Sequence, residues 1–536
     1  MLTGAVPWPA ALARRYRRDG YWTGETLAEL LRGPARDRPT HPAVATRADQ
    51  VGYAELDRRC DALAGGLRAA GARAGDRWVV QLPNSVELVT VCVAMFRLGV
   101  IPVLTLTAHR LAEIGSLCAS ADAAGLVIPD VHLGYDHRTL ARAVAAAVPG
   151  VRSVVVAGEP AEFTALAELA GADPVDPAPP DPDEVALCLL SGGTTGLPKL
   201  IPRTHNDYAY QLRETATAMR LDGSGAYLAA LPVAHNAALG CPGVLGALRC
   251  GATAVLASSP APDDAIPLIG RAGVTLTTLM PAFLPLWAAS ADLFDVDLSR
   301  LVIEVGGAML DEATARAAEQ ALGCTLTRWF GMGEGLLSFT RVDDPPGVRL
   351  GTEGRPLCPA DELRVVGEDG RDVAPGAVGE LLTRGPYTLR GYYRADEHNT
   401  RVFTRDGFFR TGDLVRMTPA GDMIVEGRIR DVINRGGEKV PAGEVEEHLR
   451  AHPLVRDAAL VAVPDRAMGE KSAAFVIPAG ASPPSLAQLR DFLRGRGLAA
   501  YKLPDRLALV ERFPHTAIGK VDKARLRDEM LVAPAG

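Results

Sequence analysis

The sequence has few of the features that mark metal-binding, disulfide-bonded or nucleic-acid-binding proteins. Its 536 residues include only eight cysteines, which are scattered without a CxxC pair or a His/Cys spacing typical of zinc sites. This pattern favours reduced thiols in a cytoplasmic protein. A formal net charge of -7 argues against a nucleic acid or an anionic membrane surface held by charge.

Long uninterrupted hydrophobic runs are also missing. The longest apolar stretch, roughly residues 86–104, contains Glu87 and Arg97 and predicts a buried helix followed by a strand, not a membrane span. The N-terminus lacks an apolar signal core with a small-residue cleavage site. Apolar residues nevertheless make up 48% of the chain, enough to fill the cores of the several domains that this length predicts.

What the sequence does contain is an alternation of apolar runs and helical patterns. The runs at residues 78–82 and 100–104 flank a predicted helix, with Asn84 as its N-cap and Glu87 completing a capping box. Similar runs with helical patterns between them are residues 252–256, 275–279 and 301–305. The predicted fold class is therefore α/β, with a large N-terminal domain of largely parallel sheets and helices.

The pattern changes after about Gly354. Short strands separated by glycine turns predict a β-rich subdomain. Further on, a helix near residues 443–452, a strand at 458–463 and a helix at 485–495 predict a small, mobile α+β C-terminal domain. We therefore divide the chain into an N-terminal core, residues 1–429, and a C-terminal domain, residues 430–536.

The most informative local motif follows the apolar run at residues 185–190. It is Ser191-Gly192-Gly193-Thr194-Thr195-Gly196-Leu197-Pro198-Lys199. Its glycines let the backbone turn tightly and point N–H groups at an anion, while its hydroxyls and Lys199 add donors. The Walker A spacing is absent. The motif predicts a phosphate-binding loop of another kind, and the alternative is a plain surface turn.

This loop resembles the phosphate loop of the adenylate-forming superfamily, and more of that family's motifs follow in order. They are Gly306-Gly307-Ala308, Phe330-Gly331-Met332-Gly333-Glu334, Thr411-Gly412-Asp413, Gly427-Arg428-Ile429-Arg430-Asp431 and Gly519-Lys520. The resemblance extends over nearly the whole chain. It implies an enzyme that activates a carboxylic acid with ATP and Mg²⁺ as an acyl-adenylate and releases pyrophosphate.

The resemblance also implies a role for individual residues. Those it assigns to ATP are Ser191, Gly192, Gly193, Thr194, Thr195, Gly196, Lys199, Gly307, Phe330, Gly331, Asp413 and Arg428. Glu334 and Thr195 would hold the metal, since Mg²⁺ binds through one or two protein oxygens plus phosphates. The Asp413 carboxylate suits a ribose diol. Lys520 would neutralise the charge that builds between the attacking carboxylate and the α-phosphate, and Arg430 would be a hinge.

The substrate is indicated by Leu231-Pro232-Val233-Ala234-His235-Asn236. This segment resembles the aryl acid-AMP ligase subgroup, which includes stand-alone 2,3-dihydroxybenzoate- and salicylate-AMP ligases of siderophore pathways. There the asparagine binds an ortho substituent of the ring, and His235 is assigned to the catalytic site with Lys520. Residues 234–243 contain no Asp or Glu, so a neutral pocket favours a hydroxyaryl acid over an amino acid.

Three positions refine the choice of acid. Cys241 and Leu337 resemble the salicylate type, whereas Ala237 replaces a Tyr or Phe of related enzymes. The missing ring would open space for a substituted or bicyclic ortho-hydroxy acid, such as a methylsalicylate or a hydroxyquinaldate. The predicted substrate-binding residues are Asn236, Ala237, Cys241, Gly306, Gly307, Met332 and Leu337.

The acceptor of the activated acid is predicted less directly. Sixteen residues follow Lys520, too few for a carrier domain, so we expect a stand-alone enzyme that loads the phosphopantetheine thiol of a carrier protein in trans. One alternative is an aryl-CoA ligase that uses free CoA. Another is a catalytically silent ATP-binding regulatory module, against which the presence of Lys520, Asp413 and Glu334 argues.

Overall fold

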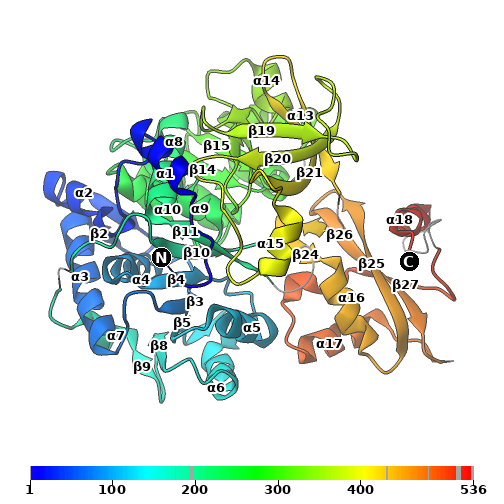
Figure 1. The fold of residues 1–536 in the computed structure, drawn as a ribbon, viewed down its shortest axis with the longest axis horizontal. Helices are drawn as coiled ribbons and strands as arrows, with labels where there is room; N and C mark the ends of the chain where they lie inside the picture. Colours follow the sequence, from blue (N-terminus) through cyan, green and yellow to red (C-terminus); the bar gives the residue numbers. More distant parts are fainter. Residues whose placement is uncertain are drawn as a thin grey trace.

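Two large, mainly parallel sheets dominate the protein in a computed structural model that describes residues 2–175, 177–191, 198–308, 310–429, 432–480, 482–514 and 521–532 (Figure 1). The nine-stranded sheet has the order β18-β17-β16-β15-β14-β12-β13-β1-β2, and the seven-stranded sheet the order β11-β10-β4-β3-β5-β8-β9. The strands of the first are β1 Pro42–Ala45, β2 Gln50–Gly52, β12 Ala226–Ala229, β13 Thr253–Leu256, β14 Leu276–Leu279, β15 Val302–Gly306, β16 Thr325–Gly331, β17 Leu337–Phe339 and β18 Arg355–Pro356. Those of the second are β3 Arg77–Val80, β4 Ile101–Leu104, β5 Gly125–Pro129, β8 Ser153–Ala157, β9 Thr164–Ala165, β10 Val185–Leu190 and β11 Leu200–Thr204. The predicted α/β fold class is confirmed.

Helices and apolar side chains cover both faces of each large sheet, as parallel sheets require. The main core cluster joins the two sheets and includes side chains from α3 Tyr53–Ala69, α4 Val86–Leu98, α8 His205–Ala218 and α10 Gly243–Arg249. A second cluster covers the other face of the nine-stranded sheet with α11 Pro262–Ala272, α12 Leu284–Ser290 and α13 Glu312–Leu322. A third covers the other face of the seven-stranded sheet with α5 Leu111–Ala121 and α6 His137–Ala147. No helix in the described ranges is both long and apolar enough to cross a membrane.

The predicted cap of α4 is wrong by one residue. Ser85 is the N-cap, and its hydroxyl accepts a hydrogen bond from the Leu88 N–H at 3.2 Å. The Asn84 side chain instead reaches the ends of β12 and β13, where its amide donates to the carbonyl oxygens of Ala229, Leu231 and Ala257 at 2.9–3.2 Å. Asn84 therefore fixes the chain that leads into residues 235–236.

The predicted β-rich subdomain is a four-stranded antiparallel sheet. Its strands are β19 Glu362–Val366, β20 Gly379–Arg384, β21 Phe409–Met417 and β22 Met423–Arg428. β21 and β22 form a predicted hairpin, whereas the connection from β20 to β21 is longer and contains α15 Asp396–Val402.

The C-terminal segment forms a separate sheet with helices, drawn in orange and red in Figure 1. Its elements are β23 Val432–Arg435, β24 Glu438–Pro441, α16 Ala442–Arg450, β25 Val455–Asp465, β26 Gly469–Pro478, α17 Leu486–Gly495, β27 Arg506–Leu509 and α18 Lys523–Val532. The predicted α+β character is confirmed. The boundary at residue 430 and the mobility of this segment stay predictions.

Candidate active site

The predicted phosphate loop joins β10 to β11, which pair antiparallel. Its two ends are held together, because the Ser191 N–H donates to the Lys199 carbonyl oxygen and the Lys199 N–H donates to Ser191 Oγ, both at 2.9 Å. Gly192, Gly193, Thr194, Thr195 and Gly196 lie outside the described residues, so their roles stay predictions.

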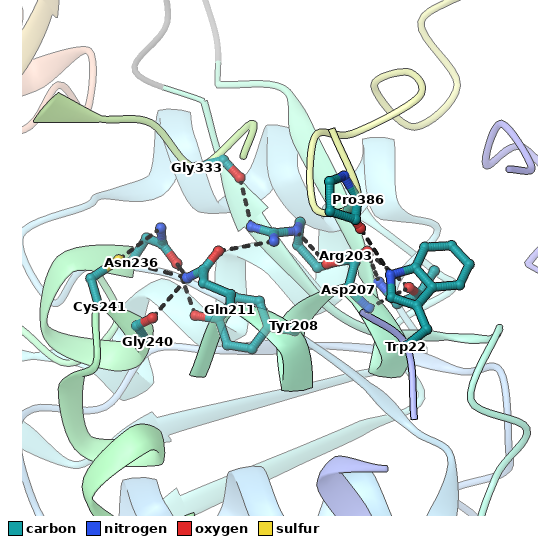
Figure 2. A network of polar contacts seen from close by, with 11 residues as sticks. Trp22, Arg203, Asp207, Tyr208, Gln211, Asn236, Gly240, Cys241, Gly333 and Pro386 are labelled. Atoms are coloured by element: carbon teal, nitrogen blue, oxygen red, sulfur yellow. Dashed lines mark hydrogen bonds and ion pairs between the residues drawn. The ribbon is translucent and has the colours of Figure 1, made fainter. Parts of the chain in front are cut away.

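Asn236 begins the short helix α9 Asn236–Gly240, and its side-chain amide is held in one orientation (Figure 2). Its Oδ1 accepts hydrogen bonds from the Tyr208 hydroxyl at 2.8 Å and from Gln211 Nε2 at 3.3 Å, both on α8. Its Nδ2 faces Cys241, with Sγ at 3.5 Å. Because the oxygen already has two donors, Asn236 presents N–H groups on its other side.

A buried arginine links this asparagine to the glycine-rich segment at residues 330–334. Arg203 Nη2 donates to Gln211 Oε1 at 2.9 Å, and Nη1 donates to the Gly333 carbonyl oxygen at 3.1 Å (Figure 2). Asp207 accepts from Arg203 Nε at 2.8 Å and balances its charge. A buried, paired guanidinium with several donors fixes its neighbours firmly, so the network orients Gln211 and through it Asn236.

His235 caps α9, and its Nδ1 accepts a hydrogen bond from the Ala237 N–H at 3.3 Å. Burial and the positive charge of Lys439 lower the pKa of His235 to about 4. The ring is therefore neutral at pH 7, and accepting at Nδ1 places its proton on Nε2. A neutral ring suits hydrogen bonding to a ligand better than it suits charge neutralisation.

Gly306 ends β15, and Gly307 follows it. Gly307 has φ +78°, which disfavours any side chain there, and a Cβ would also lie 2.8 Å from Met280 Sδ, so the methionine would have to move. The Gly307 carbonyl oxygen accepts hydrogen bonds from Asn434 Nδ2 at 2.7 Å and Lys439 Nζ at 2.9 Å. The C-terminal segment thus reaches this predicted site through the β23–β24 hairpin.

The predicted wall of the substrate pocket is apolar and buried. Ala237, Cys241 and Leu337 are at most 2% exposed and belong to the main core cluster, against which Met332 packs. Leu337 lies so close to Gly331 that a Cβ at that glycine would collide with it. The structure therefore brings four predicted substrate residues, Ala237, Cys241, Met332 and Leu337, into one apolar cluster.

Three of the predicted nucleotide and metal residues are Glu334, Asp413 and Phe330, all of which the structure describes. Glu334 is 9% exposed, and its Oε1 accepts a hydrogen bond from the Tyr392 hydroxyl at 2.6 Å. Asp413, on β21, is buried and stands opposite Arg428 of β22 in the strand register. Phe330 packs against the apolar cluster of the four-stranded sheet. Glu334 and Asp413 are thus two buried carboxyl groups, the first beside Tyr392 and the second on the four-stranded sheet.

Two predicted functional residues, Lys520 and the hinge Arg430, lie outside the described residues. Several residues that contact the site were missed by the sequence analysis: Asn84, Arg203, Tyr208, Gln211, Asn434 and Lys439. They carry no motif of their own, and they reach the site only through the tertiary fold. In the part of the chain that the structure describes, no group of three or more His, Cys, Asp or Glu is arranged to hold a metal ion. A single carboxylate such as Glu334 still fits Mg²⁺ bound mainly by phosphates and water.

Comparison with known protein families shows to which family this chain belongs. The family described as AMP-binding enzyme matches residues 31–393, and AMP-binding enzyme C-terminal domain matches residues 444–520. The chain belongs to the AMP-binding enzyme family.

Individual members of the AMP-binding enzyme family resemble it over nearly their whole length. The 2,3-dihydroxybenzoate-AMP ligase of Bacillus subtilis (strain 168) is 51% identical, with 98% of each chain covered. The salicyl-AMP ligase / salicyl-S-ArCP synthetase of Mycobacterium tuberculosis is 47% identical, with 99% of this chain and 95% of the relative covered. The solved Mycobacterium smegmatis MbtA apo structure is 46% identical with a TM-score of 0.77, covering 98% of this chain and 99% of that one. The resemblance to adenylate-forming enzymes of the aryl acid-AMP ligase subgroup is confirmed.

Proposed function

We propose that this protein uses ATP to convert an ortho-hydroxy aryl carboxylic acid to an aryl-adenylate. The observation that carries the proposal is the fixed amide of Asn236, whose oxygen is occupied by Tyr208 and Gln211. In salicylate-like acids the hydroxyl donates to its own carboxylate, which leaves the hydroxyl oxygen as an acceptor. The Asn236 Nδ2 donor matches that acceptor, and the surrounding wall of Ala237, Cys241 and Leu337 matches an aromatic ring.

The chemistry needs positioning and charge neutralisation, not a covalent enzyme nucleophile. An oxygen of the substrate carboxylate bonds to the α-phosphorus of ATP, and the bond from that phosphorus to the pyrophosphate oxygen breaks. Lys520 neutralises the charge that builds between the two reactants. Glu334 and Thr195 would hold Mg²⁺, which supplies positive charge to the phosphates, and Asp413 would bind the ribose diol.

The acyl group then passes to the thiol of a phosphopantetheinylated carrier protein. The thiol sulfur attacks the acyl carbon, and AMP leaves. A relative whose name includes salicyl-S-ArCP synthetase supports this acceptor. Free CoA is the alternative thiol, and thioester formation with holo-carrier protein against CoA separates the two.

ATP–pyrophosphate exchange across a panel of aryl acids tests the proposal. Salicylate-type acids should exceed benzoate by about five- to a hundredfold in kcat/KM, because an unmade hydrogen bond to a buried group is costly. Asn236→Leu should reduce that ratio toward one by slowing the salicylate-type acid while benzoate changes little. Exchange with no aryl acid, or a ratio that Asn236→Leu leaves intact, would contradict the proposed role.

A further inference from the structure

Glu304 is a carboxyl group in the middle of the nine-stranded sheet. It lies on β15, between β14 and β16, and is 0% exposed. Its neighbours Ile303 and Val305 point into the second core cluster, beneath α11–α13. Because side chains alternate along a strand, Glu304 points to the opposite face, where the predicted substrate pocket lies and where Gly306 ends the strand.

A directed chain of hydroxyl groups reaches one oxygen of this carboxyl. The Tyr227 hydroxyl donates to Thr278 Oγ1 at 3.1 Å, and Thr278 Oγ1 donates to Glu304 Oε2 at 2.9 Å. Glu304 Oε1 has no hydrogen-bond partner among the described residues. On β16, Thr327 Oγ1 and Trp329 Nε1 are likewise buried without a partner in the described part of the chain. Buried polar atoms are rarely left unpaired in native proteins, so these atoms need an explanation.

Glu304 and the pocket residues lie within electrostatic reach of each other. Burial, followed by the nearby Glu304 charge, raises the pKa of the Cys241 thiol. The same Cys241 Sγ lies 3.5 Å from Asn236 Nδ2 and 3.6 Å from Gln211 Nε2. Glu304 therefore faces the region that Asn236 and Cys241 line.

The protonation of Glu304 decides what its free oxygen offers. Burial raises the pKa of Glu304 to about 8, and the hydrogen bond from Thr278 offsets only part of that rise. At pH 7 the carboxyl is therefore mostly neutral. Since Oε2 already accepts from Thr278, the proton belongs on Oε1, which becomes a donor that needs an acceptor.

We propose that Glu304 Oε1 donates a hydrogen bond to an acceptor atom in the aromatic ring of the acid, so that the enzyme favours nitrogen-heteroaromatic acids over carbocyclic acids of the same shape. This inference rests on the proposed function and narrows its substrate class. Asn236 and Glu304 then form two donors for one ligand. A ring with an ortho hydroxyl oxygen and a ring nitrogen presents two matching acceptors, whereas a carbocyclic ring leaves Glu304 unpaired.

Pairs of acids that differ only at the ring nitrogen test the proposal by pyrophosphate exchange. The pairs are 3-hydroxypicolinate with salicylate, and 3-hydroxyquinaldate with 3-hydroxy-2-naphthoate. In at least one pair, the wild-type kcat/KM for the nitrogen-containing acid should exceed that of its partner by about five- to a hundredfold. Glu304→Leu should abolish this preference and change the carbocyclic rate by less than about threefold. Glu304→Gln should keep most of the preference, because its amide still provides an N–H donor.

The pH dependence of the same ratio separates a recognition role from a structural one. Between about pH 7 and 9 the wild-type preference should fall, because an ionised Glu304 no longer donates, while the Glu304→Gln ratio should stay flat. Other charged or titratable groups near this face are Tyr227, Cys241 and Arg203. Burial raises the pKa values of the Tyr227 hydroxyl and the Cys241 thiol above this window, and arginine stays charged throughout it.

Each result of these experiments bears differently on the heteroaromatic preference and on the proposed function. Equal ratios in wild type and Glu304→Leu, with exchange on salicylate-type acids intact, would overturn the heteroaromatic preference and leave the proposed function standing. The wild type could instead prefer aryl acids that carry an amino group on the ring, and Glu304→Gln could abolish that preference. Glu304 would then act as a hydrogen-bond acceptor, which would also overturn the heteroaromatic preference. Exchange with no acid would remove the proposed function together with this inference. If Glu304→Leu does not fold, the Gln variant and the wild-type pH series decide.

Discussion

Two buried polar regions of the protein differ in where their partners come from. The hydrogen bonds around Asn236 join residues within 203–333, and we call this set the pocket network: Arg203, Asp207, Tyr208, Gln211, Asn236, Cys241 and Gly333. By contrast, Lys502 Nζ lies 3.1 Å from Glu113 Oε1 and 2.8 Å from Glu444 Oε1, which joins α5 of the large N-terminal part to α16 of the C-terminal segment. The Ala499 N–H also donates to Glu113 Oε1 at 3.1 Å. We call Glu113, Glu444 and Lys502 the interface charge cluster.

The two regions therefore differ in whether they depend on the position of the C-terminal segment. The pocket network can form wherever the C-terminal segment lies, whereas the interface charge cluster exists only while that segment packs against α5. Burial opposes ionisation of Glu113, but the Lys502 ammonium, with smaller help from His109 and backbone N–H groups, leaves its pKa below the usual value. Burial raises the pKa of Glu444, which Lys502 only partly offsets. Glu113 is therefore the main counter-charge of Lys502.

The largest expected effect is on adenylate formation, when the predicted catalytic lysine of the C-terminal segment is replaced and the pocket is left unchanged. Lys520→Ala should lower adenylate formation by about a thousandfold or more, the range for losing a preorganised charge. Transfer of a chemically supplied aryl-adenylate to thiol should be far less impaired, because the pocket network is intact. Lys523→Ala is the control, since Lys523 Nζ forms a 2.8 Å ion pair with Glu446. Near-normal pyrophosphate exchange in Lys520→Ala would refute this role.

The next effect concerns the junction between the two regions. Proline fixes φ near -65°, so Arg430→Pro should obstruct a backbone rotation at the predicted hinge. Adenylation should be spared and thiol transfer reduced by about tenfold or more, measured in separate half-reaction assays. Arg430→Ala should leave both half-reactions near normal. Equal loss of both half-reactions in Arg430→Pro would argue for misfolding or for no hinge at this position.

The sequence predicts local features of this molecule better than it predicts its contacts. The strand at residues 185–190 and the helix at 485–495 follow from apolar period and a capping serine, which are local signals. Asn84 and Arg203 bind partners more than a hundred residues away in the sequence. Gln211 owes its role to burial beside Asn236, which the periodicity of its helix does not predict. Glu304 carries one signal in the sequence, because it is an acidic residue within an apolar strand run, but it lies outside the family motifs.

A smaller effect is expected from weakening the interface charge cluster. Glu113→Gln should weaken the arrangement in which Lys439 and Asn434 contact Gly307. It should therefore change one half-reaction a few fold more than the other and leave the salicylate-to-benzoate ratio unchanged. Glu444→Gln is the matched control and should change less, since Glu444 is closer to its neutral form. With its pKa depressed, Glu113 stabilises the arrangement at neutral pH, and this contribution is lost as pH falls below the usual carboxyl range. A changed acid preference in Glu113→Gln would show that the two regions are coupled.

The smallest effect is expected from substitutions at Ala237, which change the space within the predicted pocket. Ala237 is 2% exposed in the main core cluster, whereas Trp287 packs in the second cluster and donates from Nε1 to the Pro260 carbonyl oxygen at 2.8 Å. Phe283 packs beside Leu231 and Met280, in a separate small cluster. Neither ring belongs to the core cluster that contains Ala237, although Phe283 packs against a cluster that includes the adjacent Ala238.

Ala237→Phe should discriminate acids by size. Salicylate should be retained within a few fold or improved, while any bulkier ring that the wild type accepts should fall by about tenfold, the usual cost of crowding a packed site. Ala237→Leu should give an intermediate result, and pyrophosphate exchange with monocyclic and bicyclic ortho-hydroxy acids measures both. If the wild type accepts only unsubstituted salicylate and Ala237→Phe is inactive on it, the enlarged pocket is wrong. The aryl acid-AMP ligase assignment survives that result, because Asn236 and its partners do not depend on the volume at Ala237.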